Sequence, residues 1–163
     1  MPGLFRKIRG LLGSSSVQNG KSKTHGPIQI LEESYRDLCS LSRQLYSHAE
    51  RAPYPHVARR LRQMAEEARS SANLLRDKIL STGKRIEEIS GDVKSGKNHW
   101  ERMAQDLSDE KEIETRFLER AALMDEAAPE AAELLRQIAV SHRPHIDALL
   151  DLIARADPQA EQT

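Results

Sequence analysis

The chain has 163 residues, a length that fits one domain with an attached tail. Charged residues make up 31% of it and aromatic residues only 4%, which is typical of long, solvent-facing helices and argues against a β-sandwich. The 25 basic and 25 acidic side chains give a formal net charge of zero, but residues 1–26 contain basic side chains and no acid. The rest of the chain is therefore acidic, which argues against nucleic acid as a partner.

The first 13 residues have the pattern of a short, basic amphipathic helix. Apolar residues recur there at helical spacing, and basic residues occupy the other faces. We expect this segment to dock on an anionic membrane surface, or in a groove of this bundle or of a partner protein. The docking residues would be Leu4, Phe5, Arg6, Lys7, Ile8, Arg9, Leu11 and Leu12. Residues 14–26 contain almost nothing apolar and predict a flexible linker.

Residues 27–83 carry the pattern of a helical hairpin. Apolar residues recur at helical spacing from Pro27, a favourable first helical residue, up to a break at residues 53–55. A second apolar stripe fills the rest of the range and predicts a second helix. His48 and His56 flank the break, and we expect both side chains to lie in solvent.

Residues 98–157 predict another hairpin. Asn98 and Glu101 have the spacing of a capping box at its start. Pro129 follows two alanines and separates its two helices. Pro144 lies within the second of these helices, where it removes one backbone hydrogen bond and predicts a kink.

The two hairpins look like copies of one unit. When the chain is shifted by 74 residues, ten of the 25 positions that align residues 55–79 with residues 129–153 are identical, without a gap. Two amphipathic helices of similar composition could share such residues by chance. However, the run Leu-Arg-Gln-x-Ala recurs at Leu61 and Leu135, and the two helix-starting prolines coincide. We therefore favour an internal repeat.

The segment between the hairpins decides how they are arranged. An up-down-up-down bundle needs about 2–8 residues between successive helices, whereas residues 84–97 are available here. An extended segment of that length spans about 50 Å, which is enough to follow a helix and place the second and third helices parallel. We therefore predict an all-α four-helix bundle at residues 27–157, made of two repeated αα-hairpins with a long crossover. The short N-terminal amphipathic helix precedes it, and residues 158–163 form a tail.

One sequence pattern resembles a known family. The pattern Leu-x-x-x-Ala, followed by a polar stretch and another Leu, occurs in residues 61–75 and again in residues 135–149. Over about residues 27–156 the sequence thus resembles the ferritin-like, rubrerythrin-like group of duplicated four-helix bundles. The resemblance implies a site for two iron or manganese ions, with a Glu from the first helix of each hairpin and a Glu-x-x-His pair from the second.

The ligand set that this resemblance implies is incomplete. At the positions of the Glu-x-x-His pair, the first hairpin has Ala68 and Ser71, neither of which can hold a metal. The second hairpin has His142 and His145 at these positions, so the pair becomes His-x-x-His. Half of the site implied by the family is therefore missing.

Four side chains of the second hairpin remain candidates for a metal site: Glu110, Glu114, His142 and His145. The two glutamates fall on the apolar stripe of its first helix, and the two histidines fall on that of its second. Imidazole together with carboxylate suits zinc, iron or manganese. Two alternatives stay open. The histidines could form a satisfied polar layer with carboxylates and no metal, or they could lie exposed.

The sequence favours binding over catalysis. It contains no phosphate-cradling glycine loop, no paired CxxC motif and no recognisable nucleophile and base, and its single Cys39 cannot form an internal disulfide. We expect a non-enzymatic binding or scaffold protein without a cofactor, docked through residues 1–13 to a membrane or a protein. The alternative is a ferritin-like metal-binding protein or a metal-dependent oxidoreductase using iron, manganese or zinc. We expect a cytoplasmic protein, peripheral at the inner membrane face if docked, and leave a homo-oligomer open.

Overall fold

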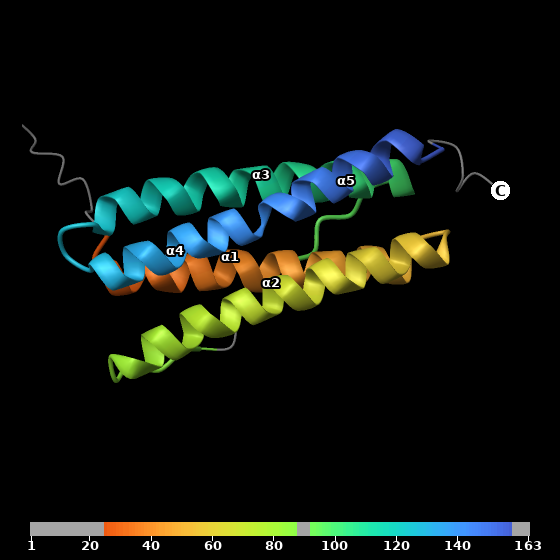
Figure 1. Ribbon diagram of the computed structural model, residues 1–163. Helices are drawn as coiled ribbons and strands as arrows, with labels where there is room; N and C mark the ends of the chain where they lie inside the picture. The colour runs from red at the N-terminus through yellow and green to blue at the C-terminus, as the bar shows by residue number, and fades with distance from the viewer. Residues whose placement is uncertain (1–24, 88–91, 158–163) are drawn as a thin grey trace, which may run out of the picture.

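The computed structural model describes residues 25–87 and 92–157. Within these ranges all regular secondary structure is helical. The helices are α1 (Pro27–Glu50), α2 (Pro55–Ser81), α3 (His99–Met124), α4 (Pro129–Ser141) and α5 (Arg143–Arg155). Since α4 and α5 follow one another along one side of the bundle, the predicted four-helix bundle is confirmed (Figure 1). The predicted amphipathic segment, residues 1–13, lies outside the described residues.

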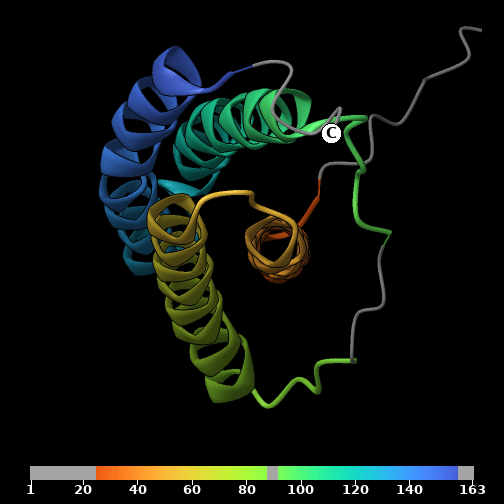
Figure 2. The ribbon, with the colours of Figure 1, turned by 90° about the vertical axis from the view of Figure 1, so that its right-hand side faces the viewer.

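Contacts between α1 and α3 establish how the hairpins are connected. Arg116 of α3 donates to Asp37 of α1 at 3.0 Å. Gln44, which lies further along α1, donates to Asp106, which lies earlier in α3, at 2.8 Å. The two helices are therefore antiparallel, and α2 and α3 run parallel (Figure 1). This arrangement is the one predicted from the length of the connection, and the described parts of residues 82–98 pass beside α1, away from α5 (Figure 2).

The crossover is anchored to α1 near both of its ends. Gly83 follows the end of α2 with φ of 83°, a left-handed conformation that glycine adopts without strain. Lys84 then pairs with Glu32 at 2.9 Å, and the backbone carbonyl of Lys94 lies 2.9 Å from Nε2 of His48. The crossover thus covers part of α1, which bears on the position of His48 described below.

Local sequence signals explain where the helices begin. The first residue of α1, α2 and α4 is a proline, whose fixed φ suits the first turn of a helix. Proline lacks a backbone N–H, but an N–H at this position would have no acceptor within the helix, so no hydrogen bond is lost. α3 instead has the side chain of Asn98 as its N-cap, which accepts from the N–H of Glu101 at 2.8 Å. Glu101 accepts in return from the N–H of Lys97, one residue before the predicted position.

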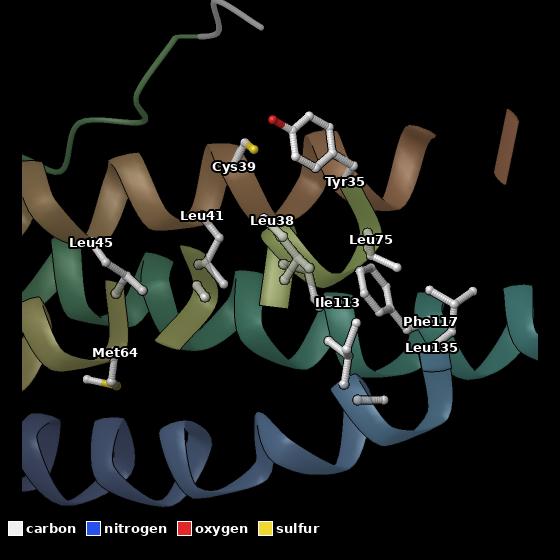
Figure 3. Close-up of a cluster of buried hydrophobic side chains, with 14 of the residues drawn as sticks. Tyr35, Leu38, Cys39, Leu41, Leu45, Met64, Leu75, Ile113, Phe117 and Leu135 are labelled. Carbon is white, nitrogen blue, oxygen red and sulfur yellow. The ribbon is translucent and has the colours of Figure 1, made fainter. Parts of the chain in front are cut away.

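The core lies along the axis between the two hairpins. Figure 3 shows apolar side chains from α1, α2, α3 and α4 meeting there. Those with no exposed surface include Leu38, Leu45, Leu61, Met64, Leu75, Met103, Phe117, Leu135 and Leu149. Burying one side chain of this size contributes about 1.5–3 kcal/mol. This packing gives a rigid frame for the few buried polar groups.

Candidate metal centre

Three ionisable side chains of the second hairpin meet inside the bundle. Glu110 comes from α3, His142 from the junction of α4 and α5, and His145 from the first turn of α5. Their exposed fractions are 0%, 1% and 1%. Nδ1 of His142 lies 2.8 Å from Oε2 of Glu110, and Nδ1 of His145 lies 2.7 Å from Oε1. Each carboxylate oxygen therefore has one imidazole as its partner.

α4 and α5 together form the fourth rod of the bundle, and the break between them positions His142 and His145 toward Glu110. Pro144 has no N–H and cannot continue the hydrogen-bond pattern of a regular helix. The rod breaks at His142, between α4 and α5, and the N–H of His145 donates to the carbonyl of His142 at 3.0 Å. The ring centroids lie 4.8 Å apart, with 64° between the planes. The kink predicted from Pro144 is confirmed, and both rings reach Glu110 from it.

The outer ring nitrogens face α2. Nε2 of His145 lies 2.5 Å from Oε2 of Glu67, whose side chain is 46% exposed. Nε2 of His142 lies 3.4 Å from the hydroxyl of Ser71. His145 thus has a carboxylate at each ring nitrogen. Because ionised carboxylates only accept hydrogen bonds, both of its nitrogens carry protons in this arrangement.

Burial and hydrogen bonding act in opposite directions on the pKa values of this cluster. Burial alone would lower the pKa of His145, but Glu110 and Glu67 raise it above its ordinary value. Burial would raise the pKa of Glu110, yet the hydrogen bonds of His142 and His145 lower it. The pKa of Glu67 is lowered in the same way, against burial, by hydrogen bonds of His145 and Gln63. Without a metal, the cluster is therefore a buried cation between two anions.

The geometry and the donor atoms fit one transition-metal ion. One ligand atom each from Glu110, His142 and His145 lies within 4.8 Å of the other two. Ligands about 2.1 Å from a shared ion lie roughly 3–4 Å apart, so small side-chain shifts would suffice. Both Nδ1 atoms point at Glu110, which leaves the Nε2–H groups for Ser71 and Glu67. A carboxylate behind a histidine is a common arrangement at metal sites, where it orients the ring.

The structure brings together three of the four predicted ligands. The fourth, Glu114, lies one turn beyond Glu110 on α3, at the edge of the bundle, and accepts from Arg143 at 2.6 Å. Of the two arrangements without metal left open by the sequence, exposed histidines are excluded by the burial of His142 and His145.

A second buried polar cluster was missed in the sequence. His48 was expected in solvent, and that prediction is wrong, because its exposed fraction is 1%. Its Nε2–H donates to the carbonyl of Lys94, and its Nδ1 lies 2.8 Å from Oδ2 of Asp106. Burial raises the pKa of Asp106, and hydrogen bonds with His48 and Gln44 offset only part of that effect. Asp106 lies four residues before Glu110 on the same face of α3, which was the available signal.

Comparisons with known proteins give the fold. No protein-family model matches the sequence, and no match was found among curated proteins. The bacterioferritin BfrA of Mycobacterium tuberculosis aligns with a TM-score of 0.72 over 83% of this chain and 92% of its own, at 20% sequence identity. A bacterioferritin of Rhodobacter capsulatus aligns with a TM-score of 0.73 over 82% and 89% of the two chains, at 18% identity. This chain has the ferritin-like fold.

The ferritin-like fold confirms the resemblance seen in the sequence and corrects two expectations. The main functional prediction, a scaffold that works by docking, is wrong, because the bundle shares the fold of bacterioferritins and contains a buried Glu110, His142 and His145 cluster. The expectation of no cofactor is wrong for the same reason. At these sequence identities the likeness concerns the fold, so the chemistry has to be argued from this chain's own residues. The described helices include none whose length and hydropathy would let it cross a membrane.

Proposed function

We propose that this chain is a ferritin-like metal-binding protein whose ion is held by Glu110, His142 and His145. One observation carries the proposal: two imidazole Nδ1 atoms and a carboxylate converge at a fully buried point, with the outer nitrogen of each ring facing a hydrogen-bonding partner. Buried imidazoles and carboxylates are costly to desolvate, and a metal ion compensates that cost through direct bonds. The protein frame around them holds the donor atoms before the ion arrives.

Iron is the first ion to test, followed by manganese and zinc. Imidazole and carboxylate ligands suit all three ions, and selection among them depends on geometry and on supply. The two structural neighbours described above are bacterioferritins, and the one from Rhodobacter capsulatus was solved with a metal-free dinuclear site and a heme iron. These features belong to that protein, and they support iron here only through the shared fold.

The chain's own residues perform three tasks in this proposal. Glu110 supplies the negative charge, and the two Nδ1 atoms supply neutral donors once their protons leave. Glu67 and Ser71 keep the outer nitrogens oriented, because their oxygens face Nε2 of His145 and His142. The surrounding core excludes water and strengthens every electrostatic interaction in the site. A bound iron or manganese ion would supply redox chemistry there, and zinc would supply Lewis acidity.

The test is metal content and its thermodynamic consequence. The full chain is purified without chelators, analysed for metals, stripped with a chelator and then incubated with Fe²⁺ without oxygen, or with Mn²⁺ or Zn²⁺. We expect near-stoichiometric binding of at least one of these ions. Ion held at 100 times its Kd should stabilise the fold by about 2.7 kcal/mol, visible as a higher Tm.

Matched variants identify the residues responsible. His142→Gln combined with His145→Gln should abolish stoichiometric binding, whereas His56→Gln, an exposed histidine elsewhere on α2, should not change it. Absence of a stoichiometric ion in the wild type after all three incubations would contradict the proposed function. Equal binding by the double variant would place the ion elsewhere and contradict it as well. A homo-oligomer stays a prediction, to be checked by the molecular mass in solution.

A further inference from the structure

We propose that the centre takes a single divalent ion per chain and that the bundle has no second ion site beside it. This inference rests on the proposed function and departs from the two-ion site implied by the ferritin-like fold. A two-ion centre between the hairpins needs carboxylate or imidazole ligands from α1 and α2 as well as from α3 and α5. At this level the described residues of α1 present none to the centre, and on α2 the carboxylate of Glu67 lies against the outer nitrogen of His145, away from Nδ1.

On α2, the level of the centre is marked by its two contacts, Glu67 with His145 and Ser71 with His142. The α2 residues that face the interior around this level are apolar and have no exposed surface. They are Met64, Ala65, Ala68, Ala72 and Leu75. Ser71 is the polar exception, and a neutral hydroxyl is a poor ligand for these ions. Glu67 lies against the outer Nε2 of His145, on the far side of the ring from Glu110, and cannot reach an ion at Nδ1 from there.

On α1, the level of the centre lies between Asp37, which pairs with Arg116, and Gln44, which bonds to Asp106. Inward-facing residues here are Leu38, Leu41 and Leu45, whose side chains point into the apolar core in Figure 3. The buried hydroxyl at this level, that of Ser42, donates to the carbonyl of Ala65 at 2.8 Å. Between Asp37 and Gln44, the inward face of α1 therefore contributes packing and the hydrogen bond of Ser42, and it presents no carboxylate or imidazole to the centre.

The nearest other buried carboxylate on α3 is already engaged. Asp106 lies one turn before Glu110, and both of its oxygens contact Nδ1 of His48, while Gln44 donates to one of them. The other nitrogen of His48 is held by the carbonyl of Lys94. This cluster joins α1, α3 and the crossover, and it is satisfied without an ion.

The net charge of the centre also favours one ion over two. One divalent ion with one carboxylate and two neutral imidazoles leaves a single positive charge, which faces the carboxylate of Glu67 behind His145. A second divalent ion would leave three positive charges beside the apolar wall of α2, and Asp106, the next buried carboxylate along α3, is already bonded to His48 and Gln44. Uncompensated charge in such surroundings is strongly unfavourable. The donor set of two histidines and one carboxylate instead matches a mononuclear site with coordination positions left open.

The test is the number of ions bound at the centre of the full chain. Metal-free protein is titrated with Co²⁺, and without oxygen with Fe²⁺, while calorimetry and visible absorption are recorded. The same titration of Glu110→Gln measures binding outside the centre. We expect the wild type to bind one ion more than the variant, with the magnetic and optical signature of an isolated ion.

The outcomes separate the two proposals. Two ions more than Glu110→Gln, or exchange coupling between two ions, would overturn the single-ion inference and leave the proposed function standing. No difference between the wild type and the variant would overturn the proposed function itself. Circular dichroism of Glu110→Gln shows whether that variant is folded; if it is not, His142→Gln serves as the second reference, because it keeps the buried carboxylate.

Discussion

The two hairpins of this bundle have the same architecture and different interiors. α1 and α2 are uninterrupted, and where α2 faces the centre it presents methionine, alanine and leucine apart from Ser71. α3 carries two fully buried carboxylates on successive turns, and the helical rod of α4 and α5 that packs on it is broken at His142, one of the two residues that carry the imidazoles. In the proposed centre, the first hairpin thus supplies packing and the outer partners Glu67 and Ser71, and the second hairpin supplies the three proposed ligands. The ferritin-like fold is therefore compatible with a first hairpin whose interior at this level is packed mainly with apolar side chains.

The largest effect that would test this contrast is expected from Glu110→Gln. The substitution preserves the size of the side chain but removes the anion that both Nδ1 atoms face. Breaking a fully buried charged network by removing one partner costs about 3–5 kcal/mol. We expect loss of stoichiometric metal binding and a decrease of about 3 kcal/mol in the free energy of unfolding, measured by chemical denaturation of the metal-free protein. Unchanged stability together with unchanged metal binding would show that the polar layer has no special role.

The matching change in the first hairpin is Leu61→Ala. Leu61 has no exposed surface, and truncating a buried leucine costs about 2–5 kcal/mol because it leaves a cavity. We expect a destabilisation of about 3 kcal/mol by denaturant titration, with the number of bound ions unchanged in the folded protein. A variant that stays folded and binds no ion would show that the first hairpin takes part directly in the chemistry.

Much of the fold could be predicted because it depends on local signals. Prolines at the starts of α1, α2 and α4 and the Asn98 cap mark the helix boundaries without any knowledge of tertiary structure. The long crossover could be predicted from the length of the segment between the two hairpins, residues 84–97. The internal repeat is a prediction of the sequence that the fold does not by itself test.

The site could be predicted only in part, for geometrical reasons. Glu110 and Glu114 are four residues apart, which is 40° more than one full turn, so the orientation of α3 decides which of them points inward. In the structure Glu110 points inward, whereas Glu114 lies at the edge of the bundle and accepts a hydrogen bond from Arg143. Glu67 was missed because it is half-exposed and belongs to the other hairpin. His48 was misjudged because the crossover residue that covers it, Lys94, is distant in sequence.

Among the described residues, Glu67 is the one ionisable contact of the first hairpin with the centre. Glu67→Gln keeps a hydrogen-bond acceptor for Nε2 of His145 but removes the charge behind the ring. Loss of such an outer partner typically weakens metal affinity 10–100-fold, or about 1.4–2.7 kcal/mol. Glu66→Gln is the matched control, since Glu66 is an exposed neighbour on α2. Calorimetric affinities that fall equally in both variants would point to surface charge rather than to orientation of His145.

The smallest effect is the pH dependence of the free energy of unfolding, which should differ between the metal-free and the metal-bound protein. The pKa of His145 is raised above its ordinary 6.5, so its contribution to stability is complete below about pH 6.5 and is lost as pH rises through the higher folded value. The pKa values of Glu110 and Glu67 lie below their ordinary 4.5, so their contribution is present above that pH and is lost as pH falls through the lower folded values. The contribution of this cluster to the free energy of unfolding of the metal-free protein should therefore be highest between about pH 4.5 and 6.5, and no single group can change that free energy by more than about 1.4 kcal/mol per pH unit.

Bound metal should reverse the trend on the alkaline side, because an ion competes with the protons on Nδ1 and gains affinity as pH rises. Denaturation curves at several pH values, with and without metal, should diverge above pH 6.5 in the wild type. His145→Gln should remove most of the decline of the metal-free curve, and an unaltered decline would assign it to groups outside the centre.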